Sequence, residues 1–320
     1  MNTQIKLAII AIAIVIPLAS LAVTQTNSPS NNSTNENSKL QVVASATFLY
    51  EFSQNIGKEM IDVTLLVPMG ADPHDWEPTI RDTERLQKAD MIIVNGIGYE
   101  HWLNSLELSD IAGILVDTSN GISTLDSANH DEEKHDDHAK EDGHDDEDNH
   151  NHGVLDPHIW LNPVFAQLQV KNIANALSNS DPTNKNYYQS NAAIYNQKLN
   201  LLDTKIRTEL SGCKTDFITF HDAFSYFSEE YGLTQHTIIS STDSHGDVTP
   251  KTLEHIISLA RELNIKVIFA EENTSTKTSQ VIAHEIGGKV LVLSPLEIIS
   301  DETYVEKMTQ NLESLKDALC

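Results

Sequence analysis

Two short loops of this sequence carry the same pattern, Asp-Pro-His-x-Trp. One loop spans residues 72–76 and the other spans 156–160. Because each residue type has a frequency of roughly one in twenty, four fixed positions recur at a given site by chance roughly once in 10⁵ trials. Proline holds the backbone before the histidine, tryptophan supplies an apolar wall, and aspartate accepts a hydrogen bond that orients the imidazole. The repeated loop therefore predicts a shared metal-binding task for His74 and His158.

A third histidine occupies a comparable position in the second half of the chain. His221 directly follows an expected strand at 215–220, just as the loop of His74 follows an expected strand at 61–67. In open α/β sheets, ligands gather outside the carboxyl ends of the strands. We therefore expect His74, His158 and His221 to converge on one divalent metal ion.

The fourth ligand is open at this stage. Glu271 ends an expected strand at 266–270 and is the first candidate, but a carboxylate there could instead bond only nearby backbone, with water completing a tetrahedral zinc site. The other histidines are expected to be ordinary surface or packing residues (His236, His255 and His284) or to lie near the rim of the site without binding metal (His101 and His245).

An acidic, histidine-rich segment spans 130–152. It holds eleven acidic residues, two lysines and six histidines, and no hydrophobic residue larger than Ala139. The histidines are His130, His135, His138, His144, His150 and His152. Such a composition predicts a solvated, disordered loop, and imidazoles interleaved with carboxylates favour weak auxiliary capture of zinc-like ions over a charged insertion without a task.

The composition favours a cationic partner. The chain has 320 residues, enough for two domains that each bury a core, and it carries 47 acidic against 21 basic residues. An excess of negative charge repels nucleic acid phosphates and concentrates cations. We expect a monomer that binds a metal ion and no nucleic acid.

The periodicity of the chain predicts two α/β lobes, each a parallel sheet flanked by helices, joined by a single long helix. Short apolar runs alternate with helical segments from residue 40, and apolar positions then recur at three and four residues from Tyr188 to Leu210. In the first half, strands are expected at 40–47, 61–67, 90–95 and 112–117, with helices near 48–59, 79–88, 99–107 and 163–178. In the second half, strands are expected near 215–220, 234–239, 266–270 and 289–293, with helices starting at Thr249 and Asp301. The expected divisions are a first lobe at 40–180, a linking helix at 181–211 and a second lobe at 212–320.

The N-terminal end predicts export. Lys6 precedes an apolar run over 7–23, which suits either a cleaved signal peptide or a retained anchor, and a polar tether follows at 24–39. We expect an extracytoplasmic protein, whether secreted, periplasmic or held at the cell surface. Cys213 and Cys320 are the two cysteines, and in an exported chain they suit a disulfide that pins the C-terminal tail.

Several motifs together resemble the substrate-binding proteins of zinc and manganese ABC importers. They are GADPHDWEP, the acidic histidine-rich insertion, DPHIWLNP, FHDAFSYF and VIFAEEN, and the resemblance covers about residues 40–320. It implies two α/β lobes on one rigid helix, metal ligands at His74, His158 and His221, and a membrane permease with a cytoplasmic ATPase as partners. Manganese-type members of this family carry a carboxylate where His221 stands. The chain departs from the family after Glu271, where Glu-Asn-Thr replaces the commoner Pro-Gln-Phe.

Zinc is the expected ion. The resemblance favours it through His221, and neutral imidazoles suit Zn²⁺, Cu²⁺ and Ni²⁺ better than Mn²⁺, which prefers oxygen ligands. Three functions fit such a site: carriage of the ion to a permease, zinc hydrolysis with Glu271 as base, and metal buffering or adhesion at a cell surface. The absence of an H-E-x-x-H helix and the histidine-rich segment disfavour an enzyme. We therefore expect a metal carrier.

Overall fold

The computed structural model describes residues 39–68, 71, 75–106, 111–125, 155–239, 248–272, 276–298 and 300–320. Four of the expectations above lie outside these residues: the N-terminal segment 1–23 with its tether, the ligand His74, the six histidines of 130–152, and His245. No helix in the described part of the chain combines the length and apolar character needed to span a bilayer.

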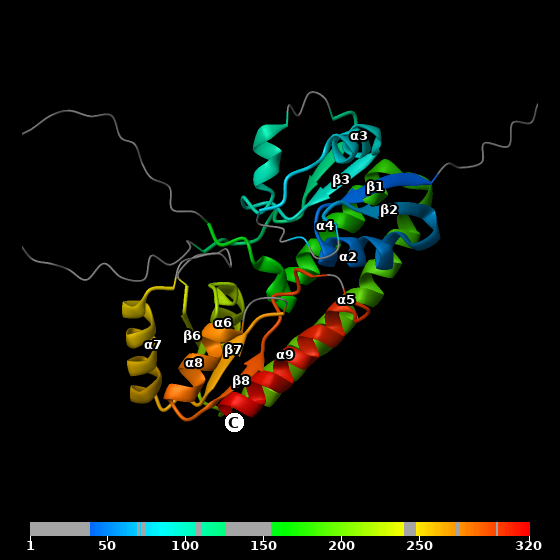
Figure 1. The fold of residues 1–320 in the computed structure, drawn as a ribbon. Coiled ribbons are helices and arrows are strands. Elements are labelled where there is room, and N and C mark those ends of the chain that lie inside the picture. The colour runs from blue at the N-terminus through cyan, green and yellow to red at the C-terminus, as the bar shows by residue number, and fades with distance from the viewer. Residues whose placement is uncertain are drawn as a thin grey trace, which may run out of the picture. The chain divides into compact units, whose positions relative to one another are not determined.

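The first lobe is built on a four-stranded parallel sheet with strand order β2-β1-β3-β4 (Figure 1). Its strands are β1 (Leu40–Ala44), β2 (Ile61–Leu65), β3 (Met91–Val94) and β4 (Ile114–Asp117). All four residues of the central strand β3 are buried, as expected of a parallel sheet covered on both faces. Its helices are α2 (Thr47–Gly57), α3 (Ile80–Lys88) and α4 (Pro163–Ser180).

The second lobe repeats this arrangement, with parallel strand order β6-β5-β7-β8. Its strands are β5 (Asp216–Thr219), β6 (Thr234–Thr237), β7 (Val267–Ala270) and β8 (Lys289–Val292). Its helices are α6 (Ser225–Tyr231), α7 (Pro250–Glu262), α8 (Lys277–Glu285) and α9 (Tyr304–Leu319). The predicted class, two parallel-sheet lobes flanked by helices, is confirmed.

One long helix, α5 (Lys185–Leu210), joins the lobes. Its 26 residues correspond to about 39 Å at a rise of 1.5 Å per residue, and its buried side chains follow the predicted spacing of three and four. They are Tyr188, Asn191, Ala192, Tyr195, Leu199, Leu202, Ile206 and Leu210. The helix packs against α2 and α4 of the first lobe and against α9 of the second (Figure 1). It begins four residues later than the expected start at 181, because Pro182–Asn184 form a 3₁₀ turn.

Two predicted helices differ in the structure. The segment expected at 99–107 is only a 3₁₀ turn, His101–Ser105, and no side chain caps its start. The last helix begins at Tyr304 rather than at Asp301, because Thr303 and Glu306 form a reciprocal capping box that satisfies two backbone donors. The starts predicted for the other two capped helices are confirmed: Asn162 caps α4 and Thr249 caps α7.

Cys213 and Cys320 form a disulfide with a Cα–Cα distance of 4.7 Å. It joins the turn that follows α5 to the end of α9, so the last helix is tied covalently to the linking helix. Closing a loop of 107 residues restricts the unfolded chain and stabilises the fold by about 5 kcal/mol in the chain-entropy account.

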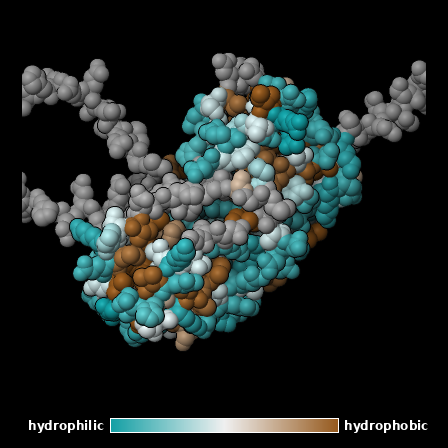
Figure 2. Space-filling model, in the orientation of Figure 1, coloured by the Kyte–Doolittle hydropathy of each residue, from teal (hydrophilic) through white to brown (hydrophobic). Residues whose placement is uncertain are grey.

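Much of the surface on the face drawn in Figure 2 is hydrophilic, in keeping with a net charge of −26. Apolar side chains gather on the second lobe around α7. On α7, Leu253 and Ile257 are only partly buried against the core of that lobe.

Candidate metal centre

His158 is held by a carboxylate of its own loop. Asp156 Oδ1 accepts from the backbone N–H of His158 at 2.9 Å and bonds the ring Nδ1 at 2.7 Å. The Asp156 carboxylate therefore selects the tautomer with the proton on Nδ1 and leaves Nε2 as the ligand atom. The ring is fully buried beside Trp160, with ring centroids 5.0 Å apart, so the wall predicted for this loop is present.

His221 is held in the same way, but by a residue from another strand. Glu271 Oε1 accepts from the backbone N–H of His221 at 3.1 Å and bonds its Nδ1 at 2.5 Å. His221 follows β5 and Glu271 follows β7, and these strands are neighbours in the sheet. The carboxyl ends of parallel strands meet at one edge, which is why residues 50 positions apart pair here.

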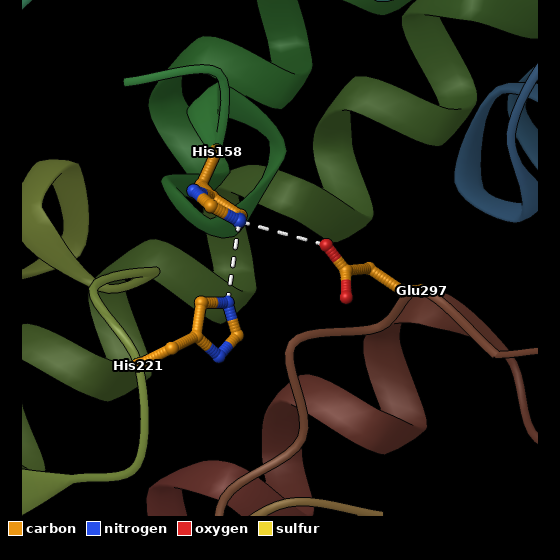
Figure 3. Close-up of side chains that lie close together, drawn as sticks. All are labelled: His158, His221 and Glu297. Carbon is orange, nitrogen blue, oxygen red and sulfur yellow. Dashed lines mark hydrogen bonds and ion pairs between the residues drawn. The ribbon is translucent and has the colours of Figure 1, made fainter. Parts of the chain in front are cut away.

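Glu297 joins the two histidines to form a three-residue cluster (Figure 3). It follows β8, the strand beside β7, so His221, Glu271 and Glu297 follow the sheet order along one edge. His158 Nε2 lies 3.4 Å from His221 Nε2 and 3.5 Å from Glu297 Oε1. One ligand atom from each of the three residues lies within 4.8 Å of the others.

These distances suit a tetrahedral metal ion. Ligand atoms about 2.0–2.1 Å from zinc at tetrahedral angles lie about 3.3–3.4 Å from one another. The separations measured from His158 Nε2, 3.4 Å to His221 and 3.5 Å to Glu297, match that edge length. The side chains of these three residues are 0%, 1% and 9% exposed, so a bound ion would be shielded from water.

The carboxylates around His158 change its protonation. Burial by itself lowers the pKa of a histidine, but the charge and hydrogen bond of Asp156, together with those of Glu297, outweigh burial and raise the pKa of His158 to about 10. Since its Nδ1 is bonded to Asp156, the proton that a metal ion displaces is the one on Nε2. Metal binding at this ring therefore releases a proton at neutral pH.

Glu271, the first candidate for the fourth ligand, bonds the backbone and the ring of His221. Its Oε1 is engaged with Nδ1 of His221, the ring nitrogen opposite the one that faces His158, and it is absent from the cluster of metal-binding donors. Glu297 was not among the candidate ligands predicted from the sequence, although it belongs to the three-residue cluster. The signal that could have found it is the same strand-end rule, since Glu297 follows β8 as His221 follows β5.

Among the described residues, four other histidines are not part of this cluster. His255 and His101 are exposed, and the side chain of His284 is 89% exposed. His236 is half-buried and bonds Asp216 at 3.0 Å across neighbouring strands.

The architecture and the cluster define a class. Two parallel-sheet lobes on one long helix, with buried histidines and a carboxylate contributed by loops at the strand ends, are the features of a two-lobed metal-binding protein.

Comparison with known proteins gives the family. The family model described as zinc-uptake complex component A, periplasmic, matches residues 42–318. The chain is 42% identical over 290 residues to the high-affinity zinc uptake system protein ZnuA of Bacillus subtilis, covering 88% of each chain. The protein therefore belongs to the ZnuA family.

Solved structures agree with this membership. The metal-dependent lipoprotein YcdH of Bacillus subtilis superimposes with a TM-score of 0.72 at 38% identity, covering 88% of this chain and 99% of that one. Zn(II)-bound AdcA of Streptococcus pneumoniae gives a TM-score of 0.72 at 28% identity. That match covers 88% of this chain but only 57% of AdcA, so this chain corresponds to a little over half of that protein.

Proposed function

We propose that this protein binds one Zn²⁺ ion through His74, His158, His221 and Glu297 and delivers it to a membrane permease driven by a cytoplasmic ATPase. The observation that carries the proposal is the pair of buried imidazoles whose Nε2 atoms face each other at 3.4 Å while a carboxylate engages each Nδ1. That arrangement presents two preorganised nitrogen ligands at the spacing of a tetrahedral zinc ion.

Glu297 takes the fourth position in this proposal. Its Oε1 lies 3.5 Å from His158 Nε2, on the side of the ring where a metal ion would bind. Glu271 bonds the far side of His221 and has the orienting role. A carboxylate in the ligand set also offsets the positive charge of the ion in a buried site.

Zinc is favoured over other ions by the imidazole ligands and by the family. Three nitrogens with one carboxylate suit Zn²⁺, Cu²⁺ and Ni²⁺, whereas Mn²⁺ prefers more oxygen. Two of the relatives named above are a zinc-uptake protein and a zinc-bound protein. Copper and nickel are separated from zinc by titrating each ion in turn.

Hydrolysis is the alternative function for such a ligand set. It would require Glu271 as a base beside a metal-bound water. Since Oε1 of Glu271 is bonded to both the backbone and the ring of His221, the residue is positioned to orient that ligand. Membership of a zinc-uptake family also supports carriage rather than catalysis.

The parts of the chain outside the described residues complete this proposal. Residues 1–23 would direct export or anchor the protein, and a family described as periplasmic supports an extracytoplasmic location. Segment 130–152 would collect ions at low affinity. Boundaries at 180 and 211 would separate the two lobes from the linking helix. The protein would act as a monomer.

Calorimetric titration of Zn²⁺ into the full chain, with a competing chelator for the tight range, tests the site. We expect one tight ion per chain, and losses of affinity by orders of magnitude in His74→Ala, His158→Ala and His221→Ala. The matched controls His255→Ala and His284→Ala remove exposed histidines and should leave the tight site unchanged. Deleting 130–152 should remove only weak binding. Unchanged tight binding in His158→Ala would overturn the assignment.

A further inference from the structure

The loop that carries Glu297 has its base in the second lobe. Ser294 follows β8, and its backbone N–H and carbonyl both bond the side chain of Asn311 on α9, each at 2.7 Å. The Ser294 hydroxyl donates to Glu272, which also pairs with Lys307 of α9 at 2.7 Å. These bonds fix the start of the loop to the lobe to which it belongs in sequence.

The tip of the same loop is held by the first lobe. The indole N–H of Trp160 donates to the carbonyl of Pro295 at 2.8 Å, and the hydroxyl of Thr47 donates to the carbonyl of Leu296 at 2.9 Å. Trp160 is fully buried and stacks on Phe48 of α2, with ring centroids 4.4 Å apart. The two donors therefore stand on rigid, packed elements of the first lobe.

The backbone between these anchors is strained. Leu296 has a φ of 62°, the left-handed conformation that favours glycine, and its side chain is 3% exposed. A branched residue keeps such a conformation only where its surroundings impose it. Here the bond from Thr47 to its carbonyl and the bond from its N–H to Ser294 Oγ at 3.2 Å impose it. The next residue is Glu297.

We propose that Thr47 and Trp160 are positioning residues for Glu297, an inference that rests on the proposed zinc site. By holding the carbonyls of Pro295 and Leu296, they set the direction in which the Glu297 carboxylate leaves the loop. The loop of Glu297 thus belongs to the second lobe by chain connection, and it is bonded to the first lobe through the carbonyls of Pro295 and Leu296. A displacement of one lobe against the other pulls on this loop and withdraws the carboxylate from the ion.

A double-mutant cycle on the full chain tests this role. Thr47→Val replaces the hydroxyl with a methyl group of similar size, and Trp160→Phe removes the indole N–H. Each is combined with Glu297→Ala, and Zn²⁺ affinity is measured by chelator competition. We expect each single variant to weaken zinc binding about two- to tenfold, the value of one buried hydrogen bond. In the Glu297→Ala background, neither should cause a further loss.

The control is Ser53→Ala. It removes a buried hydroxyl from the same helix as Thr47, and that hydroxyl donates to the carbonyl of Leu49 within the helix at 2.7 Å. It should leave zinc affinity unchanged in both backgrounds. Thermal unfolding of each metal-free variant verifies the fold, and Thr47→Val serves alone where Trp160→Phe destabilises the protein.

Three results would overturn the inference. Equal losses with and without Glu297 would mean that the two residues act on the lobes or on His158 directly. No loss of zinc affinity in either single variant would mean that the loop keeps its conformation without the bonds from Thr47 and Trp160. Equally tight binding by Glu297→Ala and the wild type would remove Glu297 from the ligand set. Failure of the proposed function has a different signature, since the wild-type chain itself would then bind no tight zinc.

Discussion

The loops of His158 and His221 both orient an imidazole ring with a carboxylate, but the two carboxylates come from different parts of the chain. Both rings bond a carboxylate through Nδ1 and turn Nε2 toward the same point. The carboxylate for His158 is Asp156, two residues earlier in its own loop, whereas the carboxylate for His221 is Glu271, 50 residues later in another strand loop. The pair of His158 and Asp156 is therefore local in the chain, whereas the pair of His221 and Glu271 depends on the assembled sheet.

The difference concerns what each loop needs in order to bind metal. The Asp-Pro-His turn places the aspartate and the ring together through its own backbone. The pair formed by His221 and Glu271 exists only when β5 and β7 lie side by side with the register that pairs Ile218 with Ile268. We expect the orientation of His158 to tolerate changes elsewhere in its lobe and the orientation of His221 to be sensitive to them.

Removing the orienting carboxylates is the most direct way to break this comparison. We expect Asp156→Ala and Glu271→Ala each to weaken Zn²⁺ binding about 10- to 100-fold, because partners of metal-binding histidines have effects of that size. Chelator competition at fixed pH gives the affinities. If Glu271→Ala cost as much as His221→Ala, Glu271 would be a ligand and the distinction between ligand and support would be wrong.

The two loops also differ in how pH acts on them. The charge of Asp156 and of Glu297 outweighs burial and raises the pKa of His158 to about 10, so its ring carries a proton in the metal-free protein at neutral pH. Zinc must displace that proton, so affinity should rise about tenfold per pH unit between pH 7 and 9. Calorimetry in buffers of different ionisation enthalpy measures the release of about one proton, and Asp156→Asn should reduce it. An affinity independent of pH in this window would contradict the raised pKa.

The raised pKa of His158 also makes the stability of the metal-free protein depend on pH. A pKa raised from 6.5 to about 10 on folding means that the folded state binds the proton more tightly. The contribution of His158 is therefore complete below about pH 6.5 and lost as pH rises through about 10. Chemical denaturation of the metal-free protein between pH 7 and 10 measures this loss of stability. In His158→Gln, the free energy of unfolding should depend less on pH over this range.

The smallest expected effect comes from the backbone support of the Asp156 loop. The hydroxyl of Tyr226, on α6 of the second lobe, donates to the carbonyl of Asp156 at 2.7 Å and accepts from the N–H of Leu125 at 3.0 Å. Tyr226→Phe removes both bonds, but only the one to Asp156 supports the turn, which keeps its own bonds, so zinc binding should weaken by about two- to fivefold. A loss as large as that of Asp156→Ala would mean that the turn is not self-supporting.

The sequence predicts most of this molecule because its main signals are local or periodic. Alternating apolar runs give the strands, and the three and four spacing from Tyr188 to Leu210 gives the linking helix. Repetition of one motif drew attention to His74 and His158, and placement after a strand drew attention to His221. The capping pair of Thr303 and Glu306 is equally local. Asp301, two residues before Thr303, is also a suitable N-cap, so the predicted start of α9 was wrong.

The remainder depends on contacts that no local pattern contains. Glu271 and Glu297 both follow strands of one sheet, and only their directions decide that Glu297 lies 3.5 Å from His158 Nε2 while Glu271 bonds Nδ1 of His221. In the proposal above, the direction of Glu297 depends on Leu296, whose left-handed backbone is bonded to Thr47 of the other lobe. Such a contact joins positions 249 residues apart, beyond the reach of periodicity or motif.

The most direct test of the zinc site is a crystal structure of the full chain with zinc, with the ion located by its anomalous scattering. We predict one strong peak about 2.0–2.1 Å from the Nε2 atoms of His158 and His221 and about 2.0–2.2 Å from a carboxylate oxygen of Glu297, with His74 as the remaining ligand and Glu271 on Nδ1 of His221. A peak bound by Glu271, or one more than about 4 Å from the two Nε2 atoms, would contradict the site proposed for this protein.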